Sequence, residues 1–142
     1  SADNKHRTFE NLFPTNHKFY GYMDFVSLQN IHDVRASLQL KPTTRSTINI
    51  EGHGFWLADT HDNFYSVSGS PRTSGGYGIN AGYSNFVGTE LDIVASYTLT
   101  RSAQLEAGYG HFFTGGYVRS SLAGVGGDRD ADWFYAAFTV KF

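Results

Sequence analysis

Residues 134–142 read FYAAFTVKF, and apolar side chains occupy every second position of this segment. Successive side chains of a β-strand point to opposite faces, so the alternation predicts a strand with one apolar and one mostly polar face. The apolar row ends at the aromatic ring of Phe142. Aromatic rings gather where transmembrane strands leave the hydrocarbon. The segment therefore fits either a strand of an outer-membrane barrel or the last strand of a soluble β-sandwich.

The composition of the 142-residue chain favours the membrane alternative. Cys is absent, which excludes a disulfide framework and thiolate chemistry. The mean hydropathy is slightly negative, and no apolar run approaches the roughly 20 residues of a spanning helix. A transmembrane barrel tolerates such a polar average, because half of each strand faces a wet lumen. The formal net charge of -2 argues against a nucleic-acid partner.

The same two-faced alternation recurs along the chain. We expect one domain over 1–142, with 1–30 as a loop or a first strand and five strands within 31–142. The expected strands cover 31–41, 46–58, 87–99 and about 104–113, and the last begins near Ala131. These lengths are close to the 9–11 residues of a tilted transmembrane strand.

The connections between the expected strands alternate in length. Short turns follow Lys41 and Leu99, whereas long loops occupy 59–86 and 115–130. Short turns on one rim and long loops on the other are typical of an outer-membrane barrel.

Six blocks of sequence carry a resemblance to a known family. They are LFPTNHKFYG (12–21), NIHDVR (30–35), HGFWLAD (53–59), VGTELD (87–92), AGYGHFF (107–113) and DAD (130–132). In this order they resemble the C-terminal portion of the alginate export family, whose members are longer. The resemblance implies a large Gram-negative outer-membrane barrel that passes an anionic polysaccharide or a related solute.

Five strands are too few for a closed barrel, because bacterial single-chain barrels have at least eight. Residues 18–26 are a candidate sixth strand, and 64–68 with 77–83 are a candidate hairpin that would complete eight. Hydrocarbon does not tolerate open sheet edges. We therefore expect the remaining strands to come from a longer parent chain, which we favour, from other copies, or from that hairpin.

The polar faces of the strands define a candidate solute pathway. Its lining residues are Asp33, Arg35, Lys41, Glu51, His53, Glu90, Asp92, Glu106 and Lys141. Acids outnumber bases in this set, whereas basic rings select anions. Either the basic residues lie on strands outside the chain, or the solute is not an anion. Alternatively, the charges only stiffen the wall through ion pairs, such as Arg35 with Asp33 or Glu90.

Catalytic and metal motifs are weak. The segment DRDAD (128–132) begins like a calcium loop but lacks the Gly and Glu at positions six and twelve. No G-x-S-x-G elbow occurs. We therefore expect no enzyme activity, cofactor or metal.

The sequence predicts an all-β protein of the Gram-negative outer membrane. The expected fold is an antiparallel transmembrane β-barrel, or the C-terminal strands of a larger one. Its expected role is a porin or exporter for a polar solute, with an anionic polysaccharide such as alginate as the candidate, and outer-membrane lipid as its surroundings. One alternative is a small eight-stranded barrel that acts as an anchor or adhesin. Another is a soluble β-barrel that binds an apolar ligand.

Overall fold

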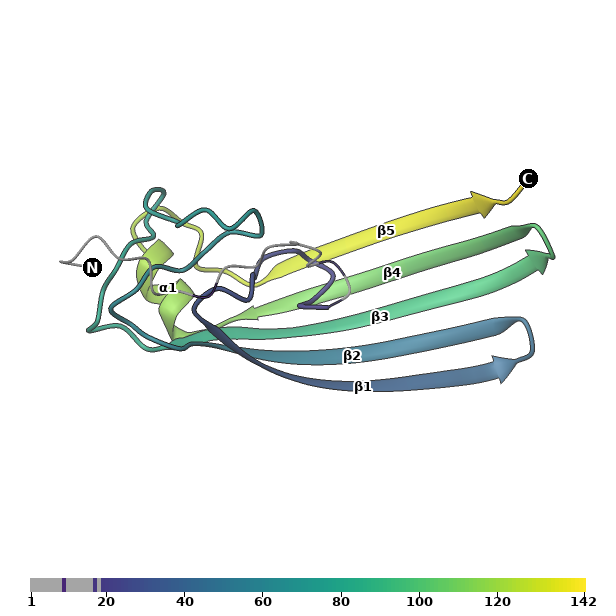
Figure 1. The fold of residues 1–142 in the computed structure, drawn as a ribbon, viewed down its shortest axis with the longest axis horizontal. Helices are drawn as coiled ribbons and strands as arrows, with labels where there is room; N and C mark the ends of the chain where they lie inside the picture. The colour runs from purple at the N-terminus through teal and green to yellow at the C-terminus, as the bar shows by residue number, and fades with distance from the viewer. Residues whose placement is uncertain (1–8, 10–16, 18) are drawn as a thin grey trace.

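A single antiparallel sheet organises the chain, as Figure 1 shows for the computed structural model. The structure describes Phe9, His17 and residues 19–142. Its elements are β1 (Ile31–Thr43), β2 (Ser46–Leu57), β3 (Phe86–Thr100), β4 (Ala103–Thr114), α1 (Gly116–Leu122) and β5 (Ala131–Val140). The strand order is β1-β2-β3-β4-β5, so sequence neighbours are sheet neighbours. The sheet is open, with β1 and β5 at its edges.

The five expected strands are confirmed, and most of their ends lie within a few residues of the predicted ones. The main difference is that Pro42 and Thr43, which we predicted in a turn, extend β1. Thr43 pairs with Ser46 after an irregularity in the ladder beyond Leu40. Proline is tolerated there because β1 is an edge strand, where a missing N–H breaks no inner ladder.

The additional strands that the sequence left open do not form among the described residues. Residues 19–30 consist of turns, bends and irregular backbone, with positive φ at Gly21, Asp24 and Asn30. Such φ values interrupt an extended strand. Lys18, the first residue of that candidate strand, lies outside the described residues. The candidate hairpin over 64–83 contributes only an isolated bridge between Tyr65 and Pro71.

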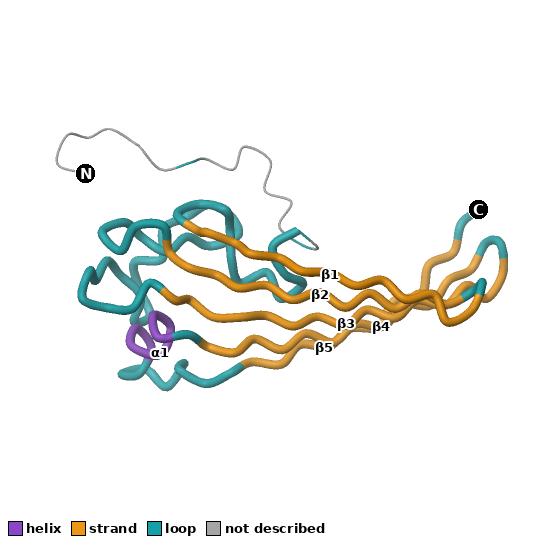
Figure 2. Tube along the Cα trace, turned by 90° about the horizontal axis from the view of Figure 1, so that it is seen from below, coloured by secondary structure: helices purple, strands orange, loops and turns teal. Residues whose placement is uncertain are grey.

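Loops of different length lie at opposite ends of the sheet. The β1–β2 and β3–β4 turns lie together at one end, called the turn end, and the long loops and α1 lie at the other, called the loop end (Figures 1 and 2). The buried apolar cluster lies at the loop end, where residues of the strands meet the long loops and α1. Its members are Val26, Ile31, Phe55, Leu57, Phe64, Val87, Phe112, Tyr117 and Val118. In the described part of the chain, no helix is long and apolar enough to span a membrane.

The register gives the sheet two chemically different faces. On the outer face, Leu38, Ile50, Ile93, Tyr109 and Phe134 form one row across all five strands. On the inner face, the adjacent row is Ser37, Glu51, Asp92, Gly110 and Trp133. Most outer residues are exposed, including Val34 at 65% and Phe134 at 70%, whereas Glu90 and Asp92 on the inner face are each 1% exposed. This distribution is the reverse of a soluble protein's, in which acids are rarely fully buried.

Candidate functional site

The inner face gathers the polar residues that the sequence assigned to a solute pathway. Arg35 lies opposite His53 on β2, and His53 lies opposite Glu90 on β3. One row further toward the turn end, Glu51 lies opposite Asp92. Alternation places these side chains on one face, and the register then brings them into one cluster. We call Asp33, Arg35, Glu51, His53, Glu90 and Asp92 the polar cluster.

Two charge-assisted contacts connect β1 to β2 within the polar cluster. Arg35 Nη2 donates to Glu51 Oε1 at 2.7 Å, and His53 Nδ1 lies 3.0 Å from Asp33 Oδ1. The sequence anticipated a cross-strand pair for Arg35, but its partner is Glu51 instead of Asp33 or Glu90. Charge-assisted pairs of this length are among the stronger protein hydrogen bonds. The Arg35 guanidinium neutralises part of the acidic charge on the inner face.

Glu90 and Asp92 lie beneath residues 21–23. The Met23 N–H donates to Glu90 Oε1 at 2.8 Å, and the Tyr22 N–H donates to Asp92 Oδ2 at 3.3 Å. Both acids lie on the predicted face, but this segment covers them. In this structure they are therefore not open to a passing solute.

Glycine residues allow residues 21–23, which we call the cover, to lie close to the two acids. Gly21 has a φ of +91°, and a Cβ there would lie 2.5 Å from the Glu90 carboxyl group. On the sheet side, a Cβ at Gly110 would lie 2.6 Å from Asp92 Oδ1. The alternation of apolar and polar residues does not predict that residues 21–23 cover the two acids. A glycine inside a strand-like pattern, a known sign of close backbone approach, was the available signal.

The cover also brings a tyrosine to the acids. Tyr22 is 5% exposed. Burial raises the pKa of its hydroxyl, and the neighbouring carboxylates of Glu51, Glu106 and Asp92 raise it further. Tyr22 is therefore a neutral hydrogen-bonding group near neutral pH.

The other predicted pathway residues lie closer to the turn end. Glu106 accepts a hydrogen bond of 2.6 Å from the Tyr135 hydroxyl, which reaches it from β5. Lys41 and Lys141 are exposed at the turn end. The predicted residues therefore do not form one ring. The polar cluster lies toward the loop end, Glu106 lies closer to the turn end, and the two lysines lie at the turn end itself.

Residues 128–132 have a local structural role. Asp130 Oδ1 accepts hydrogen bonds from the Thr114 N–H at 2.8 Å and from the Thr114 hydroxyl at 2.9 Å. These bonds hold the pKa of Asp130 below its usual range. The carboxylate therefore ties the chain before β5 to the end of β4.

Comparison with family models assigns the chain to a class of protein. Residues 1–131 match the model described as alginate export. The chain belongs to the alginate export family. This match confirms the resemblance carried by the sequence blocks. The matched residues include the loop end and β1 to β4. No curated protein matches the chain. The alginate export family is a transport family of the outer membrane and not an enzyme family, so the family-level role is export.

Proposed function

We propose that the chain forms part of the wall of a transmembrane β-barrel in the outer membrane and lines a path for a polar solute. The observation that carries this proposal is the outer face, where apolar residues of all five strands align in continuous rows. They are exposed on β1, β3, β4 and β5 and partly exposed on β2. A contiguous exposed apolar surface of this kind marks contact with a membrane or a partner. Its combination with charged residues on the opposite face is typical of barrel strands.

The dimensions of the outer face support a membrane contact. Trp56 and Phe86, with ring centroids 5.6 Å apart, lie toward the loop end, and Tyr97 and Phe138 lie toward the turn end. From Phe86 to Tyr97 the backbone rises roughly 36 Å at 3.3 Å per residue. A strand tilt of about 45° reduces this to about 25 Å, the height of the apolar band of outer-membrane barrels.

Closure of the barrel requires further strands. The outward edges of β1 and β5 are not paired with each other in the described sheet. An edge in hydrocarbon would leave backbone N–H and C=O groups without partners, at a cost of several kilocalories per mole each. We propose that strands from elsewhere in a longer chain, or from other copies, pair with these edges.

An anionic polysaccharide such as alginate is the proposed solute. The acids on the inner face would repel an anion, but most of them are paired or covered. Glu51 is paired with Arg35 and Asp33 contacts His53, whereas Glu90 and Asp92 lie under residues 21–23. Lys41 and Lys141 remain exposed, and basic residues attract anions in pores.

Solute entry into protein-containing vesicles tests this proposal. We expect a uronate oligosaccharide to enter faster than a neutral oligosaccharide of equal length. Replacing both lysines (Lys41→Gln with Lys141→Gln) should slow only the anionic solute, because it removes two positive charges from the pathway. Arg45→Gln is the matched control, since Arg45 lies in the β1–β2 turn outside the polar face. Equal entry of both oligosaccharides would contradict the proposed solute.

A barrel that acts as an anchor or adhesin is the second candidate. The observation that favours it is the cover over Glu90 and Asp92, because an anchor would have a packed interior. The same vesicle experiment separates the two functions. Protein that is inserted in the membrane as a closed barrel but admits neither oligosaccharide would support the anchor and exclude the pore.

A further inference from the structure

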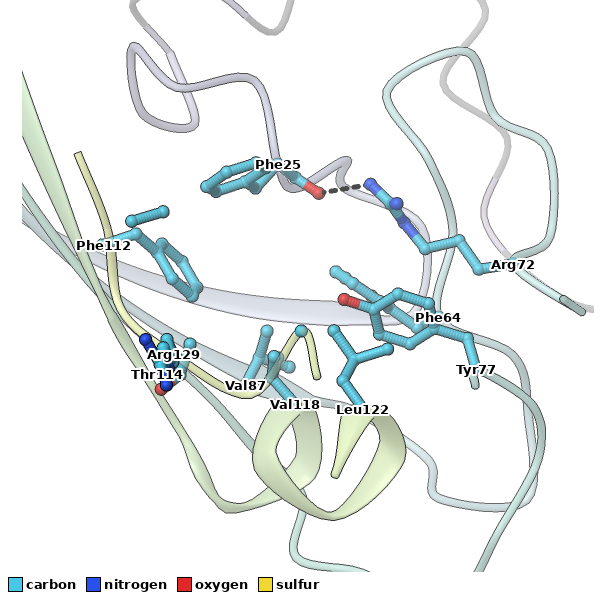
Figure 3. Close-up of a pocket in the computed structure, with 12 residues that line it drawn as sticks. Phe25, Phe64, Arg72, Tyr77, Val87, Phe112, Thr114, Val118, Leu122 and Arg129 are labelled. Carbon is cyan, nitrogen blue, oxygen red and sulfur yellow. Dashed lines mark hydrogen bonds between the residues drawn. The ribbon is translucent and has the colours of Figure 1, made fainter. Parts of the chain in front are cut away.

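A cavity at the loop end lies apart from the polar cluster. Its volume is about 170 Å³, and Figure 3 shows the side chains around it. Pockets for drug-sized ligands are larger, roughly 300–1,000 Å³. This cavity therefore has room for one small ring and not for an extended chain. Its walls are mostly apolar and include Phe64, Val87, Phe112, Val118 and Leu122.

Arg72 provides an oriented donor at this cavity. Its Nη2 donates to the Phe25 carbonyl oxygen at 3.0 Å (Figure 3). Its guanidinium carbon lies 5.0 Å from the ring centroid of Phe64 and 5.5 Å from that of Tyr77. These contacts hold the guanidinium in place. Its Nε is buried and has no hydrogen-bond partner, and such an unsatisfied donor is costly.

Arg129 adds a second positive charge. It lines the same cavity, on the side opposite Arg72 and next to Thr114 (Figure 3). Among the described residues Arg129 has neither a hydrogen bond nor an ion pair, and the residues that line the cavity include no Asp or Glu. The cavity therefore combines an apolar body with uncompensated positive charge. This combination favours an anion over a neutral or cationic ligand.

The lining of the cavity is poorly suited to a ligand with many hydroxyl groups, because among its described residues Thr114 is the one hydroxyl-bearing side chain besides Tyr77. Thr114 Oγ1 already donates toward Asp130 and Asp128 and accepts from Arg119 Nε. A sugar ring would bring several hydroxyl groups against Phe and Val side chains, where they would lack partners. An apolar ring can pack against the same Phe and Val side chains without leaving any hydroxyl group unpaired.

We propose that this cavity binds a small carboxylate carried on a single apolar ring, of about the size of benzoate. The ring packs among Phe64, Phe112 and Val118, and the carboxylate accepts a hydrogen bond from Arg72 and is attracted by Arg129. This ligand class differs from the polysaccharide proposed above, and the site does not depend on the existence of a pore.

Ligand-detected NMR titrations on the purified protein in detergent test the site, with benzoate as the probe. We expect benzoate to bind roughly tenfold or more tightly than benzyl alcohol, because the alcohol lacks the negative charge that pairs with the two arginines. Glucuronate, which has the charge but a hydroxylated ring, should also bind roughly tenfold or more weakly than benzoate. These comparisons use the unmodified protein and need no variant.

Two variants and a control locate the binding. Arg129→Gln should weaken benzoate binding several-fold. Arg72→Lys should weaken it roughly tenfold, because lysine keeps the charge but lacks the planar guanidinium group. Arg101→Gln, at the turn end, should leave binding unchanged. Equal binding of benzoate and benzyl alcohol, tighter binding of glucuronate, or no effect of Arg129→Gln would overturn the proposal.

Discussion

Gly21 determines how closely residues 21–23 approach the polar cluster. Its φ of +91° is unfavourable for other residues, and the Glu90 carboxyl group occupies the space that a side chain would need. The amides of Tyr22 and Met23 reach Asp92 and Glu90 only because of this approach. One residue thus decides whether two acids of the inner face are covered or open.

Gly21→Ala should therefore release the cover. The positive φ alone costs roughly 1–2 kcal/mol, and the added Cβ would overlap the Glu90 carboxyl group. We expect the Met23 amide to exchange its hydrogen at least about tenfold faster than in the unmodified protein. Gly52→Ala is the matched control, since a Cβ there has nothing within 4 Å. Equal exchange in both variants would show that Gly21 does not control the cover.

Asp130 gives a pH-dependent prediction. Hydrogen bonds from Thr114 lower the folded pKa of Asp130 below its unfolded value, so its contribution to stability is present above the unfolded pKa. It is lost as the pH falls through the folded pKa. Protection of the Thr114 amide should therefore decrease as the pH falls below about 4. Asp130→Asn should remove this pH dependence, and Asp128→Asn should keep it. A dependence that survives Asp130→Asn would contradict the assignment.

The strands were predictable from the sequence because their alternation has a period of two. It places Ile93 and Asp92 on opposite faces without any knowledge of neighbours. It does not give the register between strands, so the Arg35–Glu51 pair could not be distinguished from pairs with Asp33 or Glu90. Helix α1 was also missed. Its seven residues depend on the packing of Tyr117 and Val118 and not on an intrinsic signal.

The two faces of β3 should respond differently to a charge. Ile93→Arg should cost about 2–4 kcal/mol of membrane folding free energy if Ile93 contacts lipid near the bilayer centre. Ser96→Arg should cost much less, because Ser96 lies on the inner face. Refolding titrations into lipid vesicles measure both values. Equal costs would contradict the assignment of faces.

The whole molecule is stabilised unevenly along its length. The buried apolar cluster lies at the loop end, whereas the sheet extends away from the loops toward the turn end (Figures 1 and 2). Toward the turn end, Leu38, Leu105 and Phe138 are exposed on the outer face. A bare sheet with large exposed apolar residues is an aggregation hazard in water. A lipid environment removes that hazard by covering the outer face.

Site-directed spin labelling along β3 tests the lipid-facing orientation most directly. The sequence contains no Cys, so each introduced cysteine carries the only label. In the membrane-inserted protein, labels at Leu91, Ile93, Ala95 and Tyr97 should be accessible to oxygen and shielded from a water-soluble nickel chelate. Labels at Val94, Ser96 and Thr98 should not show this lipid pattern. Free access of the chelate to the first set, or equal accessibility of both sets, would contradict a membrane wall formed by this sheet.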